Sequence, residues 1–212
     1  MESTSTEPIF TASQSEELIK DYLSIHGYLP KRINTKQLST GIKSPDFKVY
    51  EDNKPLFYCE IKNPLLLAND ITKMFHWSTS ISKIRRFIHR AAQQFCDIDK
   101  EHNLPWVIVF TSSHFQLNWT SFSDAYLGYV ARNGKMICDL RQEKYVINYN
   151  SDVNAIDAFM WCQISPKDKK IFQFVPFVNM ESGFKTKMEN ILSKLKPNAS
   201  EDITDMNTRK YK

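Results

Sequence analysis

The stretch from Ser44 to Pro64, SPDFKVYEDNKPLFYCEIKNP, constrains the fold more than any other part of this 212-residue chain. Apolar and polar residues alternate along both of its halves, which is the pattern of half-buried β-strands. Between the halves, residues 52–55 (DNKP) are of types that favour tight turns. The sequence therefore predicts a β-hairpin with one apolar face and one polar face.

Three charged residues converge in such a hairpin. Asp46 opens the first strand and is expected to lie beside the far end of the second strand, where Glu60 occurs. Glu60 and Lys62 are two positions apart, so their side chains project from the same face, whereas Ile61 between them faces the apolar side. One site therefore gathers two carboxylates and one ammonium group.

This arrangement resembles the signature of the PD-(D/E)XK nuclease superfamily, which is a proline-aspartate pair, a variable gap, and then an acid, any residue and a lysine. Pro45-Asp46 and Glu60-Ile61-Lys62 match it position by position. The resemblance implies an α/β fold of the restriction-endonuclease type, a three-layer core in which a central mixed β-sheet is flanked by helices. It also implies metal-dependent hydrolysis of phosphodiester bonds, with DNA rather than RNA as the expected substrate.

The residue types suit this chemistry. Carboxylate oxygens are ligands that Mg²⁺ and Mn²⁺ prefer, and a bound divalent cation lowers the pKa of its water. We therefore expect Asp46 and Glu60 to bind Mg²⁺, with Mn²⁺ as an alternative, and Lys62 to position the attacking water. The resemblance adds the backbone carbonyl of Ile61 as a further ligand. The plainer alternative is an ordinary hairpin that exposes three unrelated charged residues.

Residues 13–25 before the hairpin are predicted to form a helix. Ser13 and Glu16 have the spacing of a capping box, an apolar stripe recurs at helical spacing, and Gly27 marks the end. In the superfamily, the first helix often carries an extra acid that faces the metal. Glu16 borders the apolar stripe and is the candidate, whereas Glu17 lies on the far side. Acids also favour a helix N-terminus for electrostatic reasons alone.

A long helix is predicted over residues 81–101, after a loop over 68–80. Its buried stripe consists of Ile84, Ile88, Ala91 and Phe95. On a helical wheel of about 100° per residue, Gln94 lies on a shoulder of this stripe and Gln93 points away from it. Superfamily members often have a glutamine or lysine on this helix that reaches the active site. Gln94 is therefore the candidate, and Gln93 is the alternative because a bend would exchange the two.

The same helix carries a run of basic residues, and no acid occurs from Ile81 to Phe95. The run consists of Lys83, Arg85, Arg86, His89 and Arg90. We single out Lys83, Arg86 and Arg90 as candidates to bind the phosphate backbone of a nucleic acid. A solvated helix face explains the run equally well.

Two further segments are weaker candidates. His76-Trp77 has residue types that stack on unpaired bases, although such pairs more often pack a loop against the protein. Residues 106–110 (WVIVF) predict a buried central strand, and the polar cluster at 111–114 follows its end, where α/β sheets bind ligands. An ordinary polar loop is the more common explanation for such a cluster.

The remaining elements are less distinctive. We expect helices over 123–130, 154–162 and 182–195, an edge strand over 171–177 that contains Pro176, and two short strands over 135–140 and 144–149 that pair with each other. Residues 1–12 and 196–212 are polar and are expected to be disordered tails. The intervening residues 13–195 are expected to form one domain.

Composition excludes several other classes. The four cysteines are scattered singly, without zinc-site spacing, and fit a reducing compartment, so a cytoplasmic location is expected. The sequence has neither a P-loop nor a glycine-rich dinucleotide motif, and no apolar run long enough to span a membrane. The formal net charge of +4 at pH 7 permits nucleic-acid binding without requiring it.

Three hypotheses remain open at this stage. The first is a metal-dependent nuclease. The second is a catalytically inactive domain of the same fold that binds nucleic acid within a larger complex. The third is a protein-interaction domain in which the acids are incidental. Nucleases that cut both strands commonly act as dimers, so a homodimer is among the expected assemblies, although no residue marks an interface.

Overall fold

The computed structural model describes residues 10–34, 42–64, 77–114, 117–132, 135–139, 149–165 and 167–195. In chain order the elements are α1 (Ala12–Ile25), β1 (Leu29–Arg32), β2 (Phe47–Glu51), β3 (Lys54–Lys62), α2 (Trp77–Ile98), β4 (Trp106–Ser112), α3 (Trp119–Leu127), β5 (Tyr129–Arg132), β6 (Lys135–Asp139), α4 (Tyr149–Ala155), β7 (Ala158–Ser165), β8 (Lys170–Val178) and α5 (Lys185–Lys194).

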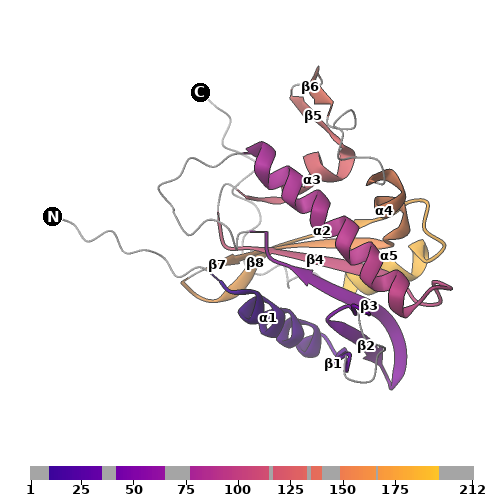
Figure 1. Ribbon diagram of the computed structural model, residues 1–212. Helices are drawn as coiled ribbons and strands as arrows, with labels where there is room; N and C mark the ends of the chain where they lie inside the picture. Colours follow the sequence, from indigo (N-terminus) through magenta and orange to yellow (C-terminus); the bar gives the residue numbers. More distant parts are fainter. Residues whose placement is uncertain are drawn as a thin grey trace.

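Six of the strands form one open mixed sheet in the order β1-β2-β3-β4-β7-β8. The central strands β3, β4 and β7 are parallel, whereas β1 and β2 at one edge and β8 at the other pair antiparallel. β5 and β6 form a separate hairpin that projects from the rest of the molecule (Figure 1). The predicted α/β class with a central mixed sheet is therefore confirmed.

Helices cover both faces of this sheet and give the molecule three layers (Figure 1). Along β4, Trp106, Ile108 and Phe110 pack in one core with α2, α3 and α4. Val107 and Val109 face the opposite core, which α1 and α5 complete. Burial on both faces explains why the sequence of this strand is continuously apolar. The predicted central strand is confirmed and extends to Ser112.

The predicted hairpin is β2 and β3. Its turn is tighter than residues 52–55, because Lys54 already pairs with Glu51. The two turn residues, Asp52 and Asn53, have φ angles of 50° and 62°. Positive φ at both central residues is what a type I′ turn requires, and this turn type matches the twist of the two strands.

The start of α1 differs from the prediction. Thr11 and Gln14 form the capping box, with the Gln14 side chain accepting from the Thr11 backbone at 2.8 Å and the Thr11 side chain accepting from the Gln14 backbone at 3.2 Å. The predicted pair, Ser13 and Glu16, has the same spacing, so spacing alone could not choose between them. Phe10 is buried, so residues 10–12 belong to the folded part rather than to a tail.

Several predictions for the second half of the chain are wrong. The helix predicted over 123–130 is α3, which begins earlier because the Asn118 side chain caps it, and ends at Gly128 with φ at 72°. β6 pairs antiparallel with β5, a pairing that the sequence did not predict, and the strand expected over 144–149 falls up to residue 148 outside the described residues. Residues 140–148 lie outside the described part of the chain.

The helix predicted over 154–162 is also wrong. The chain forms α4 up to Ala155 and then β7, which lies between β4 and β8 in the sheet. A short apolar run that is buried on both faces has no periodicity that separates a strand from a buried helix. The edge strand containing Pro176 is confirmed as β8, and the last helix is confirmed as α5.

The long helix α2 begins and ends a few residues earlier than predicted. Among the described residues, no helix combines the length and the apolar character that crossing a membrane would require.

Asp157 connects the beginnings of β4 and β7 through hydrogen bonds. Its buried Oδ2 accepts a hydrogen bond from the Trp106 backbone at 2.7 Å and lies 2.6 Å from Nε2 of His102, and Ser182 Oγ donates to Oδ1. The Asp157 backbone also bonds to Trp106 at 3.0 Å and to Asn179 at 2.9 Å. These bonds hold β7 beside β4, in the position that the sequence did not predict.

Replacing Asp157 with alanine should lower the free energy of unfolding by about 3 kcal/mol, because it leaves buried donors unsatisfied. Chemical denaturation at a constant m-value measures this change. Asp168 bonds Ser165 at the surface, and Asp168→Ala should change the stability by less than about 0.5 kcal/mol. Similar small effects in both variants would contradict the role given to Asp157.

Candidate active site

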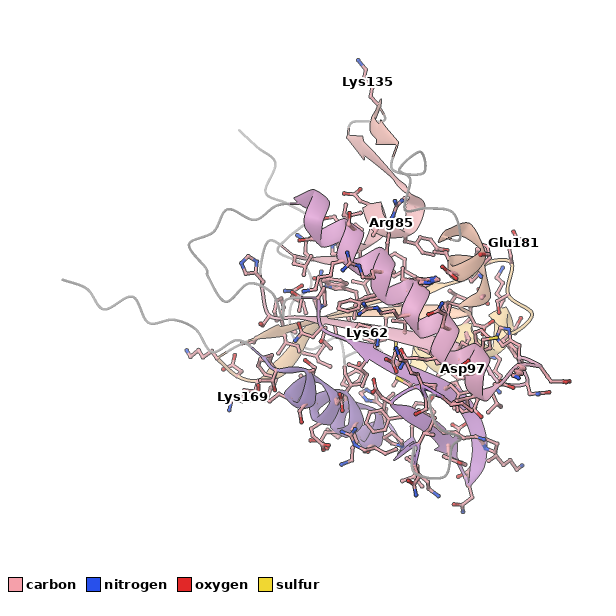
Figure 2. All side chains as sticks on the ribbon, in the orientation of Figure 1. Lys62, Arg85, Asp97, Lys135, Lys169 and Glu181 are labelled. Atoms are coloured by element: carbon pink, nitrogen blue, oxygen red, sulfur yellow. The ribbon has the colours of Figure 1, made fainter. Side chains whose placement is uncertain are left out.

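Glu60 and Lys62 lie near the end of β3, on the face that α2 covers. Tyr58 of the same strand packs in the α2-side core, whereas Cys59 and Ile61 face the α1 side. Lys62 lies between β3 and α2 (Figure 2). Since β3 runs parallel to β4, this is a carboxyl end of parallel strands, where α/β sheets commonly bind ligands.

Two main-chain hydrogen bonds hold Asp46 against Glu60. The Asp46 N–H donates to Glu60 Oε2 at 3.0 Å, and the Ile61 N–H donates to Asp46 Oδ2 at 2.7 Å. Regular pairing of β2 with β3 ends at Phe47 and Cys59. At the next residue of each strand, the Glu60 and Asp46 carboxylates accept hydrogen bonds from backbone N–H groups that would otherwise bond to a backbone carbonyl of the paired strand. The predicted proximity of Asp46 and Glu60 is therefore confirmed.

Lys62 is held from two sides. Its ammonium group forms an ion pair with Glu60 Oε1 and donates to Gln94 Oε1 at 3.3 Å. Gln94 in turn donates to the Ser44 carbonyl at 2.9 Å. Gln94 thus links α2 to the end of β3 and to the segment before β2, and it reaches the site as the helical wheel predicted. Gln93, the alternative, is exposed.

The two carboxylates are buried close together, and Glu60 is only 2% exposed. The pKa of Asp46 is raised to about 7, mainly by burial and to a smaller extent by repulsion from Glu60. The Ile61 N–H and Lys62 oppose this shift without cancelling it, and Glu16 adds to it. The site therefore has more negative charge than its own lysine neutralises.

Glu16 lies close enough to Asp46 to raise its pKa, yet its carboxylate is already paired. Oε2 of Glu16 is 2.7 Å from Arg32 Nη2 on β1, and Arg32 also reaches Glu17 at 3.4 Å. Glu16 is the less exposed of the two acids, at 21% against 50%. Its role beside a metal stays a prediction, and binding there requires its ion pair with Arg32 to rearrange.

The basic run on α2 divides into three groups. Arg85 is buried, and His89 contacts Asp152 on α4 at 2.7 Å, so these two residues serve the packing of α2. Arg86 and Arg90 are exposed. Figure 2 shows Arg85 on α2 above Lys62.

Lys83 belongs to a third setting. It is partly buried, and its Nζ lies 5.8 Å from the ring centroid of Phe87. Lys83, Phe87, Arg90 and Gln94 follow one another at spacings of four, three and four, so they share one side of the helix. We call these four residues the α2 stripe. It leads from the Gln94 contact with Lys62 toward the beginning of α2.

Asn63 was missed by the sequence analysis. It is buried directly after Lys62, and its amide donates to the Phe10 carbonyl at 3.0 Å and to Ser15 Oγ at 3.1 Å. These bonds fix the start of α1 beside the end of β3. The available signal was a polar residue that continues a buried strand directly after the motif lysine.

The weaker candidates lie apart from these contacts. His76 is outside the described residues, and Trp77 is the first residue of α2. Ser112 bonds to the backbone of His114, and the His114 carbonyl accepts from Gln163 on β7 at 2.9 Å. Burial lowers the pKa of His114. Ser112 and His114 are therefore hydrogen-bonded to each other, and His114 is bonded to Gln163 of β7.

Comparisons of the chain with protein-family models, with curated proteins and with solved structures found no match. The functional interpretation therefore depends on the residues and their geometry.

The raised pKa of Asp46 predicts that the folding stability depends on pH in the absence of metal. Its pKa is higher in the folded protein, about 7, than the ordinary value of 3.8, so the folded state binds the proton more tightly. The resulting stability is present below about pH 4 and is lost as the pH rises to 7. Asp46→Asn removes this loss and keeps an oxygen for the Ile61 N–H. The variant should melt about 3 °C higher than wild type at pH 8, with a smaller gain at pH 5.

Thermal unfolding in EDTA at the two pH values measures the difference. Asp97→Asn removes an exposed acid from α2 (Figure 2) and should show no pH-dependent gain. A lower melting temperature for Asp46→Asn at pH 8 would indicate that Asp46 is a partner in a structural ion pair.

Proposed function

We propose that this protein is a metal-dependent nuclease of the PD-(D/E)XK type, with a restriction-endonuclease-like fold, that hydrolyses phosphodiester bonds in DNA. The observation that carries the proposal is the unbalanced charge of the site. The Glu60 carboxylate pairs with Lys62, and the Asp46 carboxylate lies close enough to Glu60 for the two acids to repel each other. The hydrogen bond from the Ile61 N–H compensates the second acid only in part, and a divalent cation would supply the missing positive charge.

The donor set suits Mg²⁺ or Mn²⁺. Within the described residues, no group of three or more His, Cys, Asp or Glu side chains is arranged to hold a metal. Asp46 and Glu60 are the proposed side-chain ligands, because Mg²⁺ is commonly bound by one or two carboxylates together with water. The Ile61 N–H points to Asp46, and a strand residue directs its N–H and C=O to the same side. The Ile61 carbonyl oxygen is therefore a further candidate metal ligand on the same side as Asp46.

A divalent cation bound by these groups supplies a Lewis acid and a water of lowered pKa. The chain itself supplies the positioning. Lys62 presents an ammonium group beside the carboxylates, where it orients the attacking water and stabilises negative charge that develops on the phosphate. Gln94 restrains Lys62 from the α2 side, and the bond from Gln94 to Ser44 restrains Gln94 in turn. Exposed Arg86 and Arg90 are proposed to attract the phosphate backbone.

Wild-type protein should cleave plasmid or single-stranded DNA with Mg²⁺ or Mn²⁺. Lys62→Ala should reduce the cleavage rate by about 10²-fold or more and leave metal affinity nearly unchanged, because Lys62 is not a ligand. Asp46→Asn should lose both cleavage and metal binding. Lys100→Ala, which removes an exposed lysine after α2, is the control and should behave as wild type.

Calorimetry on the same proteins separates the competing explanations. Metal binding without cleavage of DNA would redirect the search to RNA, to a specific sequence or to a missing partner. Absence of both cleavage and metal binding would overturn the proposal and favour a protein-interaction domain. Equal loss of metal binding in Lys62→Ala and Asp46→Asn would contradict the roles assigned to them.

Gln94 is proposed to act through Lys62 rather than on the substrate. Gln94→Leu should lower kcat about tenfold while leaving KM, metal affinity and melting temperature close to wild type. Gln93→Leu on the exposed side of the same helical turn is the matched control and should change none of these values. A Gln94→Leu variant that loses only stability would show that the contact is structural.

A further inference from the structure

The ammonium group of Lys83 is buried in an unusual environment. Its Nζ is shielded from solvent and meets no hydrogen-bond acceptor within the described residues. Burial, with a smaller contribution from Arg86, lowers the pKa of Lys83. A buried ammonium group without an acceptor destabilises a protein, so it is retained where something outside the fold completes it.

The helix offers Lys83 no internal counter-ion. The positions three and four residues away on either side are Thr79, Ser80, Arg86 and Phe87. No acid occurs from Ile81 to Phe95. An anionic ligand would supply the acceptor that the described residues do not.

Lys83 and Lys62 of the proposed active site lie near the same aromatic ring. Nζ of Lys62 lies 5.9 Å and Nζ of Lys83 lies 5.8 Å from the centroid of the same ring, that of Phe87. The two nitrogens are thus separated by no more than the sum of these two distances. Each strand of a duplex presents a phosphate about every 3.4 Å along the helix axis. A strand with one phosphate at Lys62 therefore brings a neighbouring phosphate within reach of Lys83.

We propose that Lys83 turns its ammonium group out of this shielded position to bind a backbone phosphate next to the one that is cleaved, so that Lys62 and Lys83 are the two ends of a phosphate track along Phe87. This inference rests on the proposed nuclease function. Phe87 forms the wall of the track and attracts both ammonium groups through its ring. The preferred substrate is therefore a polynucleotide with phosphates on both sides of the scissile bond, rather than an isolated phosphodiester.

Two substrates distinguish a role of Lys83 in binding the polynucleotide from a role in the hydrolysis step. One is a fluorescein-labelled DNA oligonucleotide, and the other is bis(p-nitrophenyl) phosphate, which has a single phosphate. Lys83→Met removes the charge and keeps the length of the side chain. It should raise KM for the oligonucleotide about tenfold and leave hydrolysis of the chromogenic diester unchanged. Lys83→Arg should restore oligonucleotide cleavage in large part, and Lys100→Met should resemble wild type with both substrates.

Binding of the same oligonucleotide provides an assay that does not depend on cleavage. With Ca²⁺ in place of Mg²⁺, fluorescence anisotropy over a range of salt concentrations should show weaker binding by Lys83→Met. The slope of log affinity against log salt should decrease by about 1, as expected when one phosphate contact is lost. The melting temperature of Lys83→Met without ligand should equal or exceed that of wild type, because a buried unpaired charge is removed.

Several results would overturn the inference. They are an unchanged affinity and salt slope in Lys83→Met, an equal loss on both substrates, a lower melting temperature that accompanies the loss, or wild-type protein that does not bind the oligonucleotide. If neither cleavage nor metal binding is found but oligonucleotide binding still depends on Lys83, the nuclease proposal fails and the phosphate site at Lys83 stands. If wild type cleaves DNA and Lys83→Met cleaves and binds it as wild type does, the nuclease proposal stands and the phosphate site at Lys83 fails.

Discussion

The reciprocal hydrogen bonds between Asp46 and the end of β3 are the interaction on which the site depends. Ordinary pairing of β2 and β3 stops at Phe47 and Cys59, and the next donors on the two strands bond to carboxylates instead. This arrangement satisfies two backbone N–H groups, which would otherwise be unpaired at the end of a ladder. It also forces two acids into one buried place. The charge of the site is thus a consequence of how the hairpin ends.

Two cations lie next to this charge, Lys62 at the end of the hairpin itself and Arg32 on β1. On the α2 side, Lys62 contacts Glu60, and Gln94 holds Lys62 in position. On the α1 side, Arg32 pairs with Glu16 and so limits the additional repulsion that Glu16 exerts on Asp46. Above pH 7, where Asp46 is ionised, one net negative charge remains at the site, and a bound divalent cation would compensate it.

Local pattern was sufficient for the hairpin, for the shared face of Glu60 and Lys62, and for the choice of Gln94 over Gln93, because each depends on the period of a single element. It was insufficient for β7, whose apolar run is buried on both faces, and for the cap of α1, where two pairs have the same spacing. Asn63 and the pairing of Glu16 with Arg32 depend on contacts between α1 and the sheet. Such contacts leave no periodic trace in the sequence.

The position of α2 joins these observations. Its apolar side packs on the sheet, and the adjacent α2 stripe passes over the end of β3, so the same packing that stabilises the core aligns Gln94 and Lys83 with the carboxylates. Lys83 Nζ makes no hydrogen bond within the described residues, and the burial of its charge costs stability. A residue that costs stability at the end of a track leading to the carboxylates is best explained by the ligand that it binds. The free energy lost in folding is then recovered when a phosphate occupies the site.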